Sequence, residues 1–279
     1  MKNYGLNLEL ERQHQKPEDW PLGAAPRKCI ALIPMEERDE YLPTGEFQNI
    51  GEEKMDCASR APANIIEAKF TWLVSKHLLP PEYEKWLWDN GYIAPEEGIT
   101  FSDAFVAINS NTTRDGNSLI APLEAIRKKG LIPKSLLPQV ASFDEHHNPE
   151  RITPAMRKLG EEFVSRFTIN YERVAESQFT QLLEEDMFDV GGYAWPNPVQ
   201  GEYPKTGGTP NHAFIIYKKP PYFAFDNYID SLDGDFTKKL ASNYDLIDFG
   251  YRTVISVKEI SKKNSFFVWL RRYLAEILK

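Results

Sequence analysis

A cysteine, a histidine and an adjacent acid and amide are spaced so that one folded site could hold them. Cys57 lies where a polar stretch, QNIGEEKMD, gives way to a segment with helical periodicity. A thiol is a useful nucleophile only as the thiolate, and the dipole and free N–H groups of a helix N-terminus favour that form. The same N–H groups could stabilise an oxyanion in acyl transfer. Cys57 is therefore a candidate nucleophile, although most cysteines in soluble proteins are simply buried.

The best-placed general base is His212, which opens the strand-like run HAFIIYKK directly after GGTPN. Asp226 and Asn227 come at the end of the next strand-like run, YFAFDNY. If the two runs pair as antiparallel strands, one of these side chains can lie beside the imidazole and fix its tautomer. Only one can do so, because successive side chains on a strand point to opposite faces. Asp226 is favoured, since an ionised acceptor also stabilises the imidazolium.

The other four histidines are weaker candidates. His14 lies in the proline-rich start of the chain, and His77 comes at the end of a long helical pattern, where a cation is favourable. His146 and His147 lie in the charged run FDEHHNPE. No cysteine or well-spaced carboxylate set completes a metal site there, so we expect a solvated loop and no metal or other cofactor.

The elements that must position these residues follow from periodicity. Apolar residues recur at three- and four-residue steps from Ala58, which predicts a helix of about five turns with one buried face. Pro62 suits that helix if it lies in the first turn, so Cys57 should lie at or just before the N-terminus. Residues 1–45 look irregular, with one strand-like run at 29–33. Further helices are predicted within 81–91, 99–109, 118–129, 154–166 and 174–186, and strands at 189–196, 212–219, 222–228 and 251–258.

Composition narrows the class of protein. The 279 residues are 42% hydrophobic and carry a net charge of −8, which fits a soluble globular chain and argues against nucleic acid or anionic membrane as the main partner. No apolar run reaches the roughly 20 residues of a membrane span, and no signal-peptide pattern opens the chain. A cytoplasmic location is therefore expected, or a virion-associated one if the source is viral. With only Cys29 and Cys57, the fold does not rest on a disulfide framework. Nothing indicates the oligomeric state.

Taken in order, these features resemble the papain-like cysteine peptidases. In that family a Gln supplies an oxyanion-hole side chain, the nucleophilic Cys starts a long central helix, a His follows about 130–150 residues later, and an Asn or Asp completes the triad. Gln48, Cys57, His212 and Asp226 or Asn227 stand in that order here. The segments ITFSDAFVAI, RDGNSLIAPLEAIRKKGLI and GEYPKTGGTPNHAFIIY are similar to other landmarks of the family, and the resemblance covers residues 45–257.

The sequence also departs from the family. Eight residues separate Gln48 from Cys57, more than is usual, and Ala58 replaces the tryptophan that follows the nucleophile. Asp56 stands directly before the cysteine, where an acidic neighbour tends to raise the thiol pKa.

The resemblance implies an α+β, papain-like fold with a helical half, a long central helix and an antiparallel sheet or barrel half, and an active-site cleft between them. The expected domains are an irregular N-terminal arm (1–45), a catalytic domain (46–258) and a C-terminal amphipathic helix (259–279). The arm is expected to pack on the body rather than to act as an inhibitory propeptide.

The implied activity is hydrolysis of polypeptide substrates through a covalent thioester. Gly116 and Asn117 would line the non-primed side of the cleft through backbone hydrogen bonds, and Trp195 would lie either near His212 or in the core. Two alternatives stay open: a catalytically silent binding or structural module, and a thiol amidase or acyltransferase on the same fold.

Overall fold

The computed structural model describes residues 4–15, 20–25, 29–44, 47–205, 207–228, 236–244 and 246–258. The α-helices are α1 (Leu8–His14), α2 (Arg38–Tyr41), α3 (Cys57–Ser75), α4 (Pro81–Asp89), α5 (Asp103–Asn109), α6 (Ile120–Lys129), α7 (Phe143–His146), α8 (Pro154–Arg166) and α9 (Phe179–Glu185). The strands are β1 (Ile93–Ala94), β2 (Gly98–Ile99), β3 (Phe167–Ala175), β4 (Phe188–Gly192), β5 (His212–Lys218), β6 (Phe223–Phe225), β7 (Thr237–Lys239) and β8 (Phe249–Val257). Short 3₁₀ turns lie at Met35–Glu37, Lys134–Leu136, Pro149–Arg151 and Glu176–Gln178.

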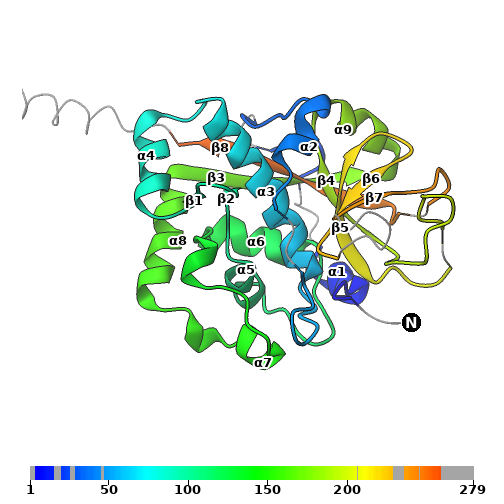
Figure 1. Cartoon of the computed structure of the whole chain (residues 1–279), viewed down its shortest axis with the longest axis horizontal. Coiled ribbons are helices and arrows are strands. Elements are labelled where there is room, and N and C mark those ends of the chain that lie inside the picture. Colours follow the sequence, from blue (N-terminus) through cyan, green and yellow to red (C-terminus); the bar gives the residue numbers. More distant parts are fainter. Residues whose placement is uncertain are drawn as a thin grey trace, which may run out of the picture.

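Helix α3 lies between the two halves of the molecule, with α4, α5, α7 and α8 to one side and β4 to β7 to the other (Figure 1). Ala61 and Ile65 pack into a hydrophobic cluster with the sheet, whereas Ile66 and Phe70 pack into a second cluster with the helices. Because both faces are covered, every residue from Cys57 to Phe70 is buried. The prediction of a single buried face was therefore wrong: the helix is central rather than amphipathic.

Pro62 also differs from the prediction. It is the sixth residue of α3, so it lies in the second turn rather than the first. At that position proline removes one intrahelical hydrogen bond and costs about 3 kcal/mol in an isolated helix. The packing of α3 on both faces holds the helix through this position, because tertiary burial contributes more to helix stability than propensity does. Cys57 is the first helical residue, as expected.

Six antiparallel strands form an open sheet in the order β3-β8-β4-β5-β6-β7, with β3 and β7 at the edges of its described part. The mixed helix and antiparallel-sheet architecture matches the predicted fold class, as an open sheet rather than a barrel. β3 was not predicted, and α9 is shorter than the helix expected at 174–186. Residues 167–175 pair along their whole length with β8, so cross-strand contacts far away in sequence decide their conformation.

The N-terminal region is less irregular than its prolines indicate. Asn7 caps α1 by accepting hydrogen bonds from the backbone N–H groups of Glu9 and Leu10. The strand-like run at 29–33 is not a strand, although Ile30 N donates to Ile255 O of β8 at 2.9 Å. The predicted C-terminal helix (259–279) lies outside the described residues. Among the residues that are described, no helix is both long and apolar enough to cross a bilayer.

Candidate active site

Cys57 lies at the junction of α3 and β5. Its Sγ accepts a hydrogen bond from the backbone N–H of Ala213 at 3.3 Å, and the residue is 1% exposed. Burial raises the pKa of the Cys57 thiol well above its usual range; the Ala213 N–H opposes this, and the carboxylates of Asp56 and Glu53 add to it. The sulfur therefore lies beside the peptide that follows His212, in its neutral form.

The register of the sheet explains which side chain reaches His212. Ile215 of β5 pairs with Phe225 of β6, so continuing that antiparallel register sets Asp226 opposite Phe214. Phe214 and His212 are two residues apart on β5, and so they share one face of the sheet with Asp226. The imidazole and the carboxylate therefore lie diagonally across two neighbouring strands.

The distances agree with that register. His212 Nε2 lies 3.4 Å from Asp226 Oδ2, and both side chains are almost fully buried. Asn227 faces the other way: its Oδ1 accepts a hydrogen bond from Asn64 Nδ2 of α3 at 3.1 Å. The structure thus brings Asp226, and not Asn227, to the histidine. Within the described residues, neither ring nitrogen of His212 makes a hydrogen bond, so the 3.4 Å contact of Nε2 with the carboxylate lies outside hydrogen-bond geometry.

Several donors hold Asp226 as a carboxylate. Lys238 Nζ lies 3.5 Å from Oδ2, Trp195 Nε1–H donates to the same oxygen, and the backbone N–H of Tyr228 donates to Oδ1. Burial alone would raise the pKa of Asp226, but Lys238 and His212 outweigh it, so the pKa lies below its usual value. An ionised carboxylate therefore faces the imidazole.

Trp195 combines the two roles considered for it. Its ring lies 5.9 Å from the imidazole of His212 and 4.9 Å from the ring of Phe214, and the ammonium of Lys238 lies 5.2 Å from its centre. The indole therefore packs in the core and also covers the pair formed by His212 and Asp226.

Gln48 is buried on the α3 side of the site. Its Nε2 donates to Glu53 Oε1 at 2.6 Å and to the backbone carbonyl of Tyr4 at 2.8 Å. Its backbone N–H donates to Asn227 O at 3.1 Å, which ties this loop to the end of β6. The side-chain amide is therefore already within hydrogen-bond reach of a peptide carbonyl, the type of group that an oxyanion-hole donor must reach.

Gly116 and Asn117 present their backbone to the site. Gly116 has a φ of +86°, which favours glycine, and its turn pairs with Thr113. The side chain of Asn117 is turned inward, where its amide donates to Ser110 O at 3.0 Å. Its main-chain N–H and C=O groups are left to pair with another segment.

That segment is the chain's own N-terminus. Asn117 N donates to Gly5 O at 2.8 Å, and Asn7 N donates to Asn117 O at 2.8 Å, in a parallel bridge centred on Leu6. One residue earlier, Tyr4 N donates at 3.1 Å to the backbone carbonyl of Asn211. Residues 4–7 therefore run along the site from His212 to the Gly116 turn, and we call them the N-terminal segment.

The N-terminal segment fits the site closely. A Cβ on Gly5 would lie 2.3 Å from Met55 O, and a Cβ on Gly191 would lie 2.6 Å from the side chain of Leu6. The ring of Tyr4 meets the imidazole of His212 edge to face at 5.7 Å. The expectation that the arm packs on the body understated this contact, because the arm enters the candidate site itself.

Sequence reasoning missed one group beside the nucleophile. His146 was expected in a solvated loop, but it is 0% exposed, and its Nε2 lies 3.2 Å from Asp56 Oδ2. Asp56 is also held by Arg60 Nε at 2.9 Å. The four-residue spacing could have indicated the Asp56–Arg60 pair, since it puts the two side chains on one helix face, but no such signal existed for His146.

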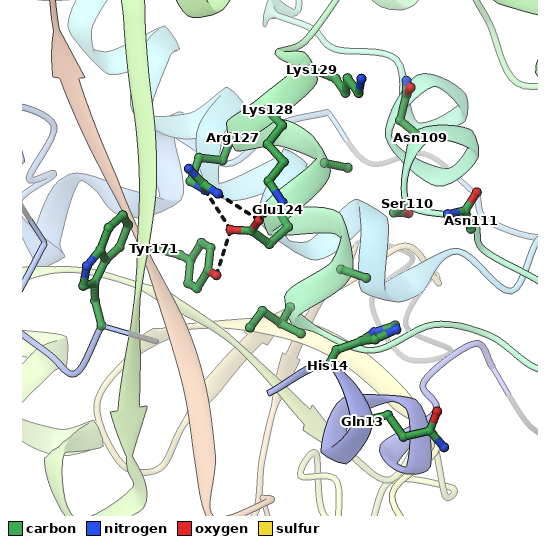
Figure 2. Close-up of a pocket in the computed structure, with 14 residues that line it drawn as sticks. Gln13, His14, Asn109, Ser110, Asn111, Glu124, Arg127, Lys128, Lys129 and Tyr171 are labelled. Atoms are coloured by element: carbon green, nitrogen blue, oxygen red, sulfur yellow. Dashed lines mark hydrogen bonds and ion pairs between the residues drawn. The ribbon is translucent and has the colours of Figure 1, made fainter. Parts of the chain in front are cut away.

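A separate cavity of about 700 Å³ lies between the end of α1 and helix α6 (Figure 2). Glu124 projects into it and accepts hydrogen bonds from Arg127 and from the hydroxyl of Tyr171. Neither Cys57 nor His212 lines this cavity, so it is distinct from the candidate active site.

No protein-family model matches the sequence, and no curated protein sequence matches it. Solved structures do. Xylellain, a cysteine protease from Xylella fastidiosa, superposes with a TM-score of 0.55 at 13% identity over 93% of this chain and 96% of its own. Procathepsin B from Trypanosoma congolense superposes with a TM-score of 0.54 at 9% identity, over 92% of this chain and 87% of its own. Procathepsin L 3 from Tenebrio molitor superposes with a TM-score of 0.54 at 10% identity, over 90% of this chain and 76% of its own. The chain therefore has the papain-like cysteine protease fold.

Proposed function

We propose that this protein is a cysteine peptidase that hydrolyses peptide bonds through Cys57, His212 and Asp226. The observation that carries the proposal is a thiol at a helix N-terminus whose Sγ accepts the backbone N–H of the residue after His212, which itself pairs with a buried carboxylate. The fold shared with cysteine proteases supports it, although a fold alone does not establish an activity.

In the proposed reaction, Nδ1 of His212 takes the proton of the Cys57 thiol, and the thiolate attacks the carbonyl carbon of the scissile bond. The backbone N–H of Cys57 and Nε2 of Gln48 hold the resulting oxyanion. The imidazolium then returns its proton to the leaving amine as the C–N bond breaks, and a thioester forms. Water, deprotonated by His212, hydrolyses the thioester and regenerates the thiol. Asp226 keeps Nε2 of the imidazole oriented and stabilises the cation.

The N-terminal segment sets a condition on this reaction. The carbonyl of Tyr4 accepts a hydrogen bond from Gln48 Nε2, and the N–H of Tyr4 donates to Asn211 O. The carbonyl of Gly5 accepts from the backbone N–H of Asn117. A peptide substrate needs these same groups, so the segment must leave before a substrate binds. The described state is the closed form of the proposed enzyme.

A silent module is the second candidate, and the closed site is the observation in its favour. A buried thiol whose pKa is raised, under a segment that fills the site, also suits a fold without turnover.

Treatment with a peptidyl epoxide, followed by mass spectrometry of the labelled peptides, separates the two. For a peptidase we expect stoichiometric labelling of Cys57 and none of Cys29, together with cleavage of a mixed peptide library. Cys57→Ala should then lower kcat by at least about 10⁴-fold without loss of the fold. Equal and slow labelling of both cysteines, with no cleavage, would support the silent module. Release of ammonia or acyl transfer without cleavage would identify the amidase or transferase alternative.

A further inference from the structure

The carboxylate beside the nucleophile is fully buried and is bound on two sides. Asp56 Oδ1 receives Arg60 Nε at 2.9 Å, and Oδ2 faces His146 Nε2 at 3.2 Å. All three side chains are 0% exposed. Arg60 also reaches Asp103 Oδ2 of α5 at 2.7 Å. Side chains from α3, α5 and α7 therefore form one network that includes the carboxylate directly before Cys57.

Arg60 also connects this cluster to the loop that carries Gln48. Arg60 Nη2 donates to Gln139 Oε1 at 3.0 Å, and Gln139 Nε2 donates to the backbone carbonyl of Gln48 at 3.2 Å. Met55, two residues before the sulfur, has a φ of +55°, a conformation that non-glycine residues keep only when their surroundings impose it. The cluster thus supports a strained turn that leads into α3.

An unpaired Asp56 would work against the chemistry proposed for Cys57. A negative charge next to a thiol disfavours the thiolate, and the effect strengthens as water is excluded. Asp56 contributes in that direction to the raised pKa of the Cys57 thiol, while Arg60 and His146 hold the pKa of Asp56 far below its usual range. The site therefore needs groups that offset this carboxylate.

We propose that His146 is a positioning residue for the nucleophile: with Arg60 it offsets the charge of Asp56, so that Cys57 can ionise. The inference rests on the proposed function of Cys57 and adds a residue that sequence spacing did not reveal. His146 acts through Asp56 and does not itself contact the reacting atoms. Charged and titratable groups from three helices and one loop surround the pair. They are Arg60 on α3, Asp103 on α5, His147 directly after α7, and Glu52, Glu53 and Lys54 in the loop before α3.

The alternative is that His146 only fills space. A double-mutant cycle on His146 and Asp56 distinguishes the positioning role from the space-filling role. Under the proposal, the effect of changing His146 depends on the presence of the Asp56 carboxylate. The readout is the rate of iodoacetamide alkylation of Cys57 against pH, with Cys57 and Cys29 resolved by peptide mass spectrometry. The apparent thiol pKa comes from that profile in the full-length chain and does not require peptidase activity.

For His146→Gln we expect the apparent pKa of Cys57 to rise by about one unit, since an amide N–H is a weaker donor than the imidazole N–H and leaves more of the carboxylate charge facing the sulfur. Asp56→Asn should lower it, and adding Asp56→Asn to His146→Gln should remove the rise. His147→Gln is the matched control, because His147 stacks on Phe143 and bonds its backbone carbonyl rather than Asp56; no shift is expected.

A rise that persists in the double variant, or no rise in His146→Gln, overturns the proposal. If His146→Gln does not fold, His146→Asn takes its place, alone and combined with Asp56→Asn, because Asp56→Asn by itself lowers the thiol pKa whether or not His146 offsets the carboxylate. Failure of the proposed function would appear differently: the alkylation profiles would shift as expected while no variant cleaved a peptide.

Discussion

Two buried pairs of a histidine and a carboxylate flank Cys57, one on the sheet side of α3 and one on its helical side. On the sheet side, His212 Nε2 lies 3.4 Å from Asp226; on the helical side, His146 Nε2 lies 3.2 Å from Asp56. Each carboxylate also has a permanent cation beside it, and each histidine has an Nδ1 without a hydrogen-bond partner in the part of the chain that the structure describes. The two pairs therefore have the same composition, although only His146 Nε2 lies in hydrogen-bond geometry with its carboxylate.

They differ in which end is next to the nucleophile. On the sheet side it is the histidine that is adjacent, because the N–H of Ala213, the next residue, binds Sγ. On the helical side the carboxylate is adjacent, because Asp56 precedes Cys57 in the chain. An imidazole beside a thiol can take its proton, whereas a carboxylate opposes ionisation. The orientation of the pair relative to the sulfur, and not its composition, therefore separates a base from a positioning group.

The largest expected effect tests that difference directly. His212→Ala should lower kcat/KM for a cleaved peptide by about 10⁴-fold, because it removes the proton acceptor. His146→Gln should lower it by only about tenfold, through the thiol alone. Steady-state kinetics of the two variants on one substrate provide the measurement.

The control for fold is circular dichroism of both variants, because each removes a buried side chain. The comparison fails if the two losses are equal, since the pairs would then be equivalent in function as well as in composition. A larger loss for His146→Gln would mean that the base has been assigned to the wrong histidine.

Much of the sheet-side pair could be predicted from sequence, because strand alternation and antiparallel pairing are local rules. His212 and Asp226 follow from two strand-like runs separated by a short turn. The helical-side pair could not be predicted, since His146 reaches Asp56 only after three helices pack, and FDEHHNPE has the composition of a surface loop. β3 was missed for the same reason: its partner, β8, lies about eighty residues away in sequence. Neither composition nor periodicity could place Gly5 against Met55.

The N-terminal segment is a second difference between the two histidine–carboxylate pairs, because its Tyr4 ring contacts His212 of the sheet-side pair. Gly5→Ala should displace it, since Gly5 has a φ of +115° and a Cβ there would lie 2.3 Å from Met55 O. When only a fraction of the molecules has an open site, the apparent affinity for substrate is reduced by that fraction. Displacing the segment raises the open fraction, so we expect kcat/KM to rise about tenfold to a hundredfold. The increase in kcat/KM should come mainly from a lower KM, with kcat little changed. Initial rates over a range of substrate concentrations separate the two parameters.

The matched control is Gly23→Ala. Gly23 also has a positive φ, +84°, but a Cβ there meets nothing within 4 Å, so kcat/KM should stay at the wild-type value. Unchanged kinetics in Gly5→Ala would show that the segment does not limit access to Cys57. A fall would show that it supports the site.

The smallest effect is one in which the two pairs should behave alike. The pKa values of Asp56 and Asp226 are both depressed in the folded protein, so each carboxylate contributes stability that is fully present above its unfolded pKa of about 4 and is lost as pH falls toward the folded value. Asp56→Asn and Asp226→Asn should each cost about 2 to 4 kcal/mol at pH 7, because each removes a carboxylate that balances the charge of a buried cation. At pH 3 each cost should be smaller by about 1 kcal/mol, since the wild type has already lost part of that contribution. Urea unfolding of the three proteins at both pH values measures the difference. If only one variant narrows the gap at low pH, the two carboxylates are not held by equivalent interactions, and their resemblance is limited to geometry.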